Sequence, residues 1–439
     1  MSAIVVTADE SERDQRAAAG ALAARGLRPG DRVAIIASGT PAYLAAALGA
    51  LRTGIVPVLI NPNLLFDEQR ALLTDSDPAL TLRADDLDEL LAGPAVELAP
   101  HPLARPMLYT SGTTGTPKGV WSGLLDEVEA AALVDEERAV WGFSPGDVHL
   151  VASALYHSAP LRFAAGTLLA GGSVVLTGVF EAAPVADAIA RHRPTTTFVA
   201  PAHLQRIFDL AEPPPLDSFR LVAHAGAPCP RPVKQRAFEV FPPGAVWEFY
   251  GSTEGQFTVC SPDESAARPG TVGRARPGRT LRRAPDGIIW CAVPRHARFE
   301  YWRDPVKTAA AWDGDAFTVG DLGRIDADGY LFLDGRRDDL VITGGMNVYP
   351  LEVERVLLTH PGVREAVVFG ADDERWGRRV CAAVVGDLDA ADIDAWLAER
   401  VAPYKRPKQV LLVDSIPMGA TGKVRRSHLA ATLGLEAGG

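Results

Sequence analysis

The chain has 439 residues, which is longer than one ordinary domain and predicts two or three domains. Apolar residues make up 47% of the chain and charged residues 23%, proportions that exclude intrinsic disorder and fibrous architectures. The net charge of −11 argues against a nucleic-acid-binding protein, so any site for an anionic ligand must be a locally basic part of an acidic molecule.

Cysteine spacing and the N-terminus predict a cytoplasmic protein without a membrane span. Cys229, Cys260, Cys291 and Cys381 form no CxxC pair, which favours buried, reduced thiols over a zinc site or a disulfide framework. The N-terminus lacks the basic and apolar regions of a signal peptide. The charge-free stretches Val33–Leu51 and Phe163–Phe180 each contain a turn signal, so we expect buried elements joined by turns.

Apolar bursts alternate with amphipathic stretches as far as His224, which is the pattern of βαβ units. Strands are expected at Arg32–Ala37, Val56–Ile60, Met107–Thr110, Val148–Ala152, Ser173–Leu176, Thr196–Val199 and Arg220–His224. Helices are expected at Ser11–Arg25, Ala42–Arg52, Leu64–Thr74, Leu124–Trp141, Arg162–Leu169 and Pro184–Arg191, with Asp85–Ala104 as a connector. Parallel strands joined by helices predict a large α/β body.

The composition and the hydrophobic pattern of the sequence change after Gly270. Glycines, prolines and short alternating runs predict a small antiparallel β subdomain as far as Asp334. A further unit of α+β character follows, with helices at Leu351–Thr359 and Ala391–Arg400 and strands at Arg364–Phe369, Val380–Val385 and Gln409–Val413. We therefore predict an N-terminal domain over residues 1–335 and a C-terminal domain over residues 336–439.

The segment from Tyr109 to Gly119 carries the strongest chemical signal. It combines five serine and threonine hydroxyls, three glycines and Lys118 at the end of a predicted buried strand. Glycines let backbone N–H groups turn toward an anion, and hydroxyls and a lysine add donors and positive charge. The segment is not a GxxxxGK[ST] loop, yet it predicts a polyphosphate site rather than a flexible polar turn.

Three later segments are weaker signals taken singly. Tyr250–Glu254 (YGSTE) offers an aromatic ring for a base and a carboxylate oxygen of the kind Mg²⁺ prefers. Gly320–Gly323, with the run from Asp334 to Asp339, offers a carboxylate and arginines for a ribose or a phosphate. Ile416–Arg426 places Lys423 on a glycine-flanked loop. Each alone also fits a solvated turn or a basic surface loop.

In this order, these motifs and the run Gly344–Pro350 resemble the adenylate-forming superfamily, which includes acyl-CoA synthetases, aryl-CoA ligases, firefly luciferase and nonribosomal adenylation domains. The resemblance covers about Leu22 to Leu429. It implies a mobile C-terminal domain with its hinge near Asp338. It also implies that ATP is bound by Thr110, Ser111, Gly112, Thr113, Thr114, Lys118, Gly226, Ala227, Pro228, Tyr250, Gly251, Ser252, Asp321 and Arg336.

The resemblance also implies the catalytic roles. Thr253 would contact the α-phosphate, Glu254 would ligate Mg²⁺, and Lys423 would bridge the substrate carboxylate and the α-phosphate. His157 would gate the acyl pocket. Gly344 and Gly345 would line a tunnel for the pantetheine arm of coenzyme A, because residues without a Cβ leave room for it.

The expected activity is that of an AMP-forming acid–CoA ligase that uses ATP, Mg²⁺ and coenzyme A. An alternative keeps the adenylation but transfers the acid to a carrier protein or an amine, or activates an unusual oxyacid. A nucleotide-binding regulator without catalysis is the third reading. Small residues, with His157, Ala200 and Ala225 among them, predict a pocket for an aromatic or short to medium aliphatic acid. Arg162 would pair with a second carboxylate if its side chain points inward.

Overall fold

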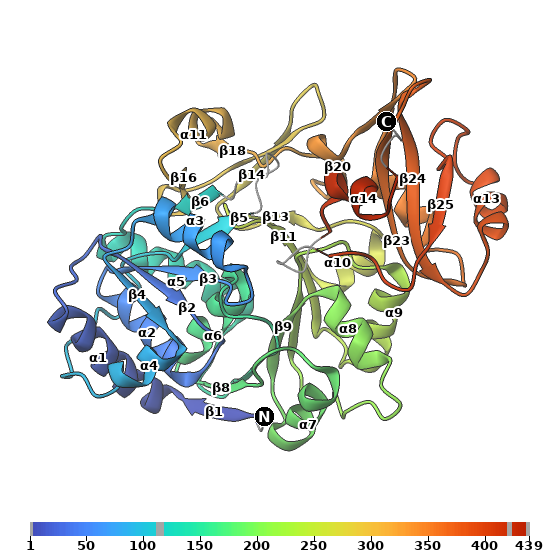
Figure 1. Ribbon diagram of the computed structural model, residues 1–439. Helices are drawn as coiled ribbons and strands as arrows, with labels where there is room; N and C mark the ends of the chain where they lie inside the picture. The colour runs from blue at the N-terminus through green and yellow to red at the C-terminus, as the bar shows by residue number, and fades with distance from the viewer. Residues whose placement is uncertain (1–2, 111–117, 419–423, 436–439) are drawn as a thin grey trace. The chain divides into compact units, whose positions relative to one another are not determined.

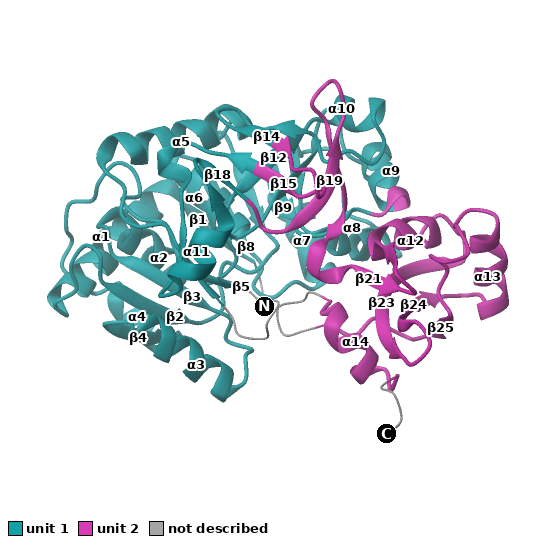
Figure 2. Ribbon diagram, turned by 90° about the horizontal axis from the view of Figure 1, so that it is seen from above, with its two compact units in different colours: residues 1–229, 233–281, 291–317 teal, residues 230–232, 282–290, 318–439 magenta. Residues whose placement is uncertain are grey.

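The computed structural model describes residues 3–110, 118–418 and 424–435, which form two compact units (Figure 2). The first unit comprises the described parts of 1–229, 233–281 and 291–317. The second comprises those of 230–232, 282–290 and 318–439.

A large sheet in the first unit has the strand order β1-β8-β7-β9-β10-β11-β12-β13 (Figure 1). Its strands are β1 (Ile4–Thr7), β7 (Val148–Val151), β8 (Ser173–Leu176), β9 (Thr196–Val199), β10 (Leu221–His224), β11 (Val246–Gly251), β12 (Gln256–Cys260) and β13 (Arg274–Ala275). Neighbours from β8 to β11 pair in parallel. Strands β1, β12 and β13 pair antiparallel and extend the sheet at its two ends.

A second sheet of this unit has the order β16-β6-β5-β3-β2-β4. Its strands are β2 (Arg32–Ile36), β3 (Val56–Ile60), β4 (Leu80–Arg83), β5 (Met107–Thr110), β6 (Lys118–Trp121) and β16 (Glu300–Tyr301). Strands β5, β3, β2 and β4 are parallel. Strands β6 and β16 are antiparallel to their neighbours, so the segment around Tyr301 joins the edge beside Lys118.

Helices connect these strands as the alternating pattern predicts. They are α1 (Ala8–Ala24), α2 (Pro41–Arg52), α3 (Phe66–Ser76), α4 (Ala84–Leu90), α5 (Glu127–Trp141), α6 (Ser158–Leu169), α7 (Ala182–His192), α8 (Pro201–Phe208), α9 (Arg231–Val240), α10 (Pro262–Ala267) and α11 (Pro305–Ala311). Local capping fixes several starts: Thr7 and Glu10 form a capping box at α1, and Thr40 caps α2 ahead of Pro41. Within the described residues, no helix is both long and apolar enough to cross a bilayer.

After β13, the chain forms a small sheet of four short strands. They are β14 (Thr280–Arg283), β15 (Ile289–Ala292), β17 (Trp312–Asp313) and β18 (Ala316–Phe317), with the 3₁₀ helix η1 (Arg295–Ala297). Strand β18 pairs antiparallel with both β15 and β17. The antiparallel β structure predicted after Gly270 is therefore confirmed.

The second unit is built around a sheet covered on both faces. Its elements are β19 (Asp321–Ile325), β20 (Leu331–Arg336), η2 (Arg337–Asp339), β21 (Val341–Thr343), β22 (Met346–Val348), α12 (Pro350–Leu357), β23 (Val363–Asp373), β24 (Gly377–Gly386), α13 (Ala390–Ala398), β25 (Gln409–Leu412) and α14 (Arg426–Thr432). Alternate residues of β24 enter two cores: Val380 and Ala382 pack with residues of α12 and α13, whereas Cys381 packs with a residue of α14. The predicted fold class, an α/β body with a C-terminal α+β domain, is confirmed.

One prediction of secondary structure is wrong. The connector expected over Asp85–Ala104 begins as helix α4, because Leu87 and Leu90 are three residues apart and both are buried. The acidic residues around these leucines hid the apolar face of the helix. Strands β1 and β4 and helices α8 and α9 are among the elements that were not predicted.

Candidate active site

Predicted site residues follow neighbouring parallel strands of the large sheet. His157 comes after β7, Ala200 after β9 and Ala225–Pro228 after β10, while Tyr250–Glu254 spans the end of β11. The carboxyl ends of parallel strands meet at one edge, where α/β folds bind their ligands. The structure therefore brings these four segments together at a single edge of the sheet.

The segment Tyr250–Glu254 forms a tight turn at the end of β11. The register of the β11–β12 pair shifts between Tyr250 and Gly251, and the Ser252 N–H donates to the Gly255 carbonyl over 2.8 Å. A Cβ at Gly255 would lie 2.7 Å from the Phe317 ring, so this position favours glycine. The turn leaves Glu254 buried, with 7% of its surface exposed.

Tyr301 forms a hydrogen bond with the Glu254 carboxylate. Its hydroxyl donates to Glu254 Oε1 over 2.9 Å. No described residue makes a hydrogen bond to the other carboxylate oxygen of Glu254. The described residues contain no cluster of three metal-ligating side chains. The single carboxylate of Glu254 fits Mg²⁺, which proteins usually bind through one or two carboxylates and the phosphates of the substrate.

Lys118, at the start of β6, forms an ion pair with Asp304. Lys118 Nζ lies 2.8 Å from Asp304 Oδ2, and Asp304 also caps α11 by accepting from the Lys307 N–H. The hydrogen bond from Lys118, and then that from Lys307, holds the pKa of Asp304 below its usual value. Because Tyr301 and Asp304 are three residues apart, one segment contacts both Glu254 and Lys118.

Sequence reasoning missed Tyr301 and Asp304. Asp304-Pro305 is a recognisable helix start, with an N-cap side chain before a proline at the first position. That signal predicts α11 but says nothing of Glu254 or Lys118. The contacts depend on the pairing of β16 with β6.

His157 is the exposed residue that precedes α6, and its ring lies 4.7 Å from that of Tyr156. His203 lies on the neighbouring helix α8 and accepts or donates at Ser153 Oγ over 3.2 Å. Burial, followed by the charges of Arg206 and His157, lowers the pKa of His203 to about 4. His203 is therefore neutral at physiological pH.

The second unit contains the predicted ribose-binding pair. Asp321 and Arg336 are direct partners in the antiparallel β19–β20 pair, and Arg336 Nε donates to Asp321 Oδ1 over 3.0 Å. The Asp321 side chain is 8% exposed and that of Arg336 is 51% exposed. The conformation before Asp321 requires Gly320, whose φ is +78°.

Asp338 and the glycine pair also lie in the second unit. Asp338 is an exposed residue of η2. Gly344 and Gly345 form the two-residue turn between β21 and β22, with φ angles of +54° and +79°, so both positions favour glycine. The Gly344 N–H donates to the Trp376 carbonyl over 2.9 Å, which fixes one side of this turn.

Some predicted residues lie outside the described part of the chain. They are Ser111, Gly112, Thr113, Thr114 and Lys423. Thr110 is the last residue of β5. Gly226, Ala227 and Pro228 lie in the loop that follows β10, and Gly226 has a φ of +91°.

Comparison with protein families decides the relationship of this chain. The model described as AMP-binding enzyme matches residues 4–105 and 91–282. The model described as AMP-binding enzyme C-terminal domain matches residues 352–423. The chain belongs to the AMP-binding enzyme family. The predicted membership of the adenylate-forming superfamily is therefore confirmed.

Characterised relatives cover nearly the whole chain of this AMP-binding enzyme. The 2-succinylbenzoate–CoA ligase of Bacillus velezensis is 32% identical over 92% of this chain and 88% of that ligase. A feruloyl-CoA synthase from an Amycolatopsis species is 33% identical over 97% of this chain and 94% of that synthase. The fatty acid–[acyl-carrier-protein] ligase ScoC of Streptomyces coeruleorubidus is 31% identical over 97% of this chain and 91% of that ligase.

Solved structures show the same relationship. The o-succinylbenzoate CoA synthetase of Bacillus subtilis, in complex with the acyl-adenylate intermediate OSB-AMP, is 28% identical with a TM-score of 0.83. The similarity covers 96% of this AMP-binding enzyme and 92% of that chain. The same synthetase in complex with ATP and magnesium ion has a TM-score of 0.82 at 28% identity.

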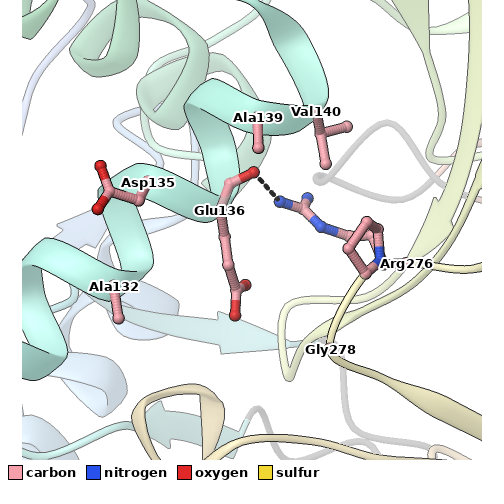
Figure 3. A pocket seen from close by; sticks show the side chains of 8 residues that line it. Ala132, Asp135, Glu136, Ala139, Val140, Arg276 and Gly278 are labelled. Carbon is pink, nitrogen blue, oxygen red and sulfur yellow. Dashed lines mark hydrogen bonds between the residues drawn. The ribbon is translucent and has the colours of Figure 1, made fainter.

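Two cavities flank a cluster of charged side chains in the first unit of the AMP-binding enzyme. The larger, of about 290 Å³, is bordered by Glu136 on α5 and by Arg276, which donates to the Glu136 carbonyl over 3.5 Å (Figure 3). The smaller, of about 30 Å³, is lined by Ser252 and Thr253 of the predicted site. We regard the smaller cavity as part of the functional site because it alone includes predicted site residues.

Arg162 lines the smaller cavity and thus points inward. Its side chain is 18% exposed, and its Nε lies 3.1 Å from Glu137 Oε2. Although burial acts to raise it, the charges of Arg162 and Arg276 hold the pKa of Glu137 below its usual value. The sequence left the direction of Arg162 open, and the structure resolves it.

Proposed function

We propose that this AMP-binding enzyme activates an aromatic carboxylic acid and transfers it to coenzyme A. As an AMP-forming acid–CoA ligase, it uses ATP, Mg²⁺ and coenzyme A. The observation that carries the proposal is the gathering of His157, Ala200, Ala225 and the Tyr250–Glu254 turn at one edge of the parallel sheet. Similarity to ligases named for 2-succinylbenzoate and ferulate supports an aromatic substrate.

The residues of the site fit a reaction between two anions. A carboxylate attacks the α-phosphate, pyrophosphate leaves, and positive charge must lie where negative charge develops. Mg²⁺ supplies part of that charge when it is bound, and Glu254 would hold it. Thr253 would contact the α-phosphate, and Tyr250 would stack on the adenine. Asp321 and Arg336 would bind the ribose, and Lys423 would approach the reacting carboxylate.

A second acceptor follows from one relative. ScoC is named for transfer of a fatty acid to an acyl carrier protein and is 31% identical to this chain. A carrier-protein thiol in place of coenzyme A is therefore the competing acceptor. Both acceptors are thiols, so the adenylation step is the same for each. We also infer that the enzyme works in the cytoplasm.

The test is a product assay with the full chain, ATP, Mg²⁺ and a panel of aromatic acids. AMP and the acyl-CoA thioester are measured with and without coenzyme A, and separately with a carrier protein. We expect AMP release that depends on both an aromatic acid and coenzyme A. Glu254→Gln should lower the rate by ~10²–10³, as expected for loss of a preorganised charged group. Glu239→Gln, on the exposed side of α9, is the matched control.

Failure would be clear. If no acid in the panel yields AMP and pyrophosphate with any acceptor, the proposed function is wrong. If AMP forms only with aliphatic acids, the acid–CoA ligase assignment holds and the aromatic preference is wrong. Thioester formed only on the carrier protein would replace coenzyme A as the acceptor.

A further inference from the structure

Arginine side chains from separate segments converge on the cavity of about 30 Å³. Arg105 precedes β5, Arg162 lies on α6, and Arg279 follows β13. The Arg279 side chain is only 3% exposed. Buried charges of one sign are costly unless they are paired and hydrogen-bonded. The way in which the structure pairs these arginines therefore indicates what the cavity holds.

Two carboxylates of α5 neutralise part of the cluster. Glu137 lies 3.1 Å from Arg162 and 2.9 Å from Arg276, and it also accepts from Gln256 over 2.9 Å. Its neighbour Glu136 lies 2.9 Å from Arg279.

Positive charge remains in excess after this pairing. His296 Nε2, 2.7 Å from Glu136 Oε1, uses the second oxygen of that carboxylate. Among the described residues, Arg105 makes no ion pair. The guanidinium groups of Arg105, Arg162, Arg276 and Arg279 thus face two carboxylates. An additional anion would bring the cluster closer to neutrality.

Orphaned polar atoms on the cavity wall are all able to donate. Within the described chain, Arg105 Nη1, Arg162 Nη2, Arg279 Nε and Ser252 Oγ are buried and have no hydrogen-bond partner. A guanidinium nitrogen only donates, and a serine hydroxyl can donate as well as accept. A buried donor without an acceptor costs free energy. One carboxylate could accept from several of these donors at once, because its two oxygens offer four lone pairs.

Burial and the neighbouring positive charges both disfavour the charged form of Arg105. Burial, and then the charges of Arg162 and Arg279, lowers the pKa of Arg105 to about 10. The Arg105 guanidinium nevertheless remains charged at physiological pH. A bound anion would stabilise the charged form of Arg105, because it would offset the repulsion from Arg162 and Arg279.

The cavity lies beside the place where the acid is expected to react. Ser158, the residue after His157, lines it together with Thr253, which would contact the α-phosphate. Its volume of about 30 Å³ matches the room that one small polar group requires. We propose that this arginine-lined cavity binds a second carboxylate of the substrate, so that the enzyme activates dicarboxylic acids. This inference rests on the proposed function.

The first test compares acids that differ only in the second carboxylate. Glutarate is paired with its mono-amide, and homophthalate with the mono-amide that retains the reactive carboxyl. AMP release by the full chain is measured for each, and kcat/KM is compared within each pair. We expect kcat/KM for the better diacid to exceed that of its mono-amide by about 10–100-fold, as for a hydrogen-bonded charge. Equal or lower values for both diacids would overturn the inference.

The second test removes one guanidinium. Arg105→Met preserves much of the volume and removes the charge, and it should lower the diacid-to-mono-amide ratio about 10–100-fold. Arg105→Lys, which keeps the charge but loses the planar fork, should lower the ratio less. Arg295→Met is the matched control, because the Arg295 side chain is 90% exposed and pairs with Glu129. Its ratio should equal that of the wild type.

The outcomes separate the two proposals. Activity with monocarboxylates and no preference for a diacid would overturn this inference and leave the proposed function intact. A wild-type preference that Arg105→Met retains would also overturn it. Chloride tests whether the cavity instead holds a structural inorganic anion. If chloride raises the melting temperature by the same amount with and without the diacid, and also raises activity with the mono-amide, the inference is wrong. Loss of AMP release with every acid would contradict the proposed function itself.

Discussion

At the scale of single residues, Tyr301 determines how Glu254 is presented. Its hydroxyl, on β16, donates to one oxygen of a carboxylate that is 7% exposed. A hydrogen bond to one oxygen restricts rotation of the carboxylate and leaves the other oxygen available to a metal ion. Groups that orient a metal ligand in this way typically contribute 10–100-fold to metal affinity or activity. Tyr301 is thus a positioning residue for the proposed Mg²⁺ ligand.

Tyr301→Phe should therefore weaken the use of Mg²⁺ with little change in the fold. We expect kcat/KM to fall about 10–100-fold and the Mg²⁺ concentration that gives half-maximal rate to rise. AMP release is measured as Mg²⁺ is titrated, and the melting temperature is recorded alongside. Tyr404→Phe, in the second unit, serves as the control. A lower melting temperature with an unchanged Mg²⁺ dependence would mean that Tyr301 has only a structural role.

The residues that the sequence could predict are those that motifs mark. Tyr250–Glu254 and the Asp321–Arg336 pair could be proposed because each motif contains its own chemistry. Tyr301 could not, because it is 47 residues from Glu254 and no local pattern links the two. The same holds for the arginine-lined cavity, where Arg105 and Arg279 are far apart in sequence. Of the arginines that line it, the sequence marks only Arg162, which is close to His157.

At the scale of elements, one arginine anchors the helix that follows Lys423 in sequence. Arg426, the first residue of α14, lies 2.8 Å from both carboxylate oxygens of Glu354 on α12 and 2.9 Å from Asp339 of η2. Burial raises the pKa of Glu354 above its usual value in spite of Arg426. The start of α14 is thus fixed by a buried ion pair, and its removal would leave a carboxylate uncompensated.

Arg426→Met should destabilise the second unit by about 3–5 kcal/mol at pH 8. Without Arg426, the pKa of Glu354 should rise further. A carboxyl whose folded-state pKa is raised adds stability at low pH and loses it as pH rises, so the variant should regain stability toward pH 5. Urea unfolding of the full chain at both pH values measures this. Arg400→Met, an exposed control, should change stability by less than about 1 kcal/mol.

If Arg426→Met is equally destabilised at pH 5 and pH 8, charge on Glu354 is not the cause.

The elements themselves differ in how well the sequence predicts them. The parallel strands β2 and β3, which are buried along almost their whole length, were predicted to within one residue, because burial on both faces makes the apolar run nearly continuous. Helix α4 was missed because its two buried leucines lie among acidic residues.

At the scale of the whole molecule, buried histidines set a lower limit to the pH range of the first unit. Burial lowers the pKa of His149 to about 3 and that of His224 to about 4. Both side chains are 1% exposed. A histidine whose folded-state pKa is depressed contributes stability above its unfolded pKa of about 6.5, and this stability is lost as pH falls toward the folded value.

We therefore expect the free energy of unfolding to fall between pH 6.5 and pH 4 by roughly 2–3 kcal/mol for each of these histidines. Chemical unfolding followed by circular dichroism at several pH values measures the slope. His149→Gln should reduce the slope, since a glutamine does not gain a proton. His428→Gln, at an exposed position of α14, should leave it unchanged. The same slope in His149→Gln and in the wild type would refute this account.

Predicted site residues occur in both units, with Tyr250 and Glu254 in the first and Asp321 and Arg336 in the second. Lys423 is proposed to act only while the acyl-adenylate forms, so its removal should separate the two half-reactions. Lys423→Ala should lower acid-dependent exchange of pyrophosphate into ATP by at least ~10². Thioester formation from supplied acyl-adenylate and coenzyme A should stay close to the wild-type rate, because that step needs no new bond to phosphorus. Equal losses in both assays would show that Lys423 supports the fold or the thiol step instead.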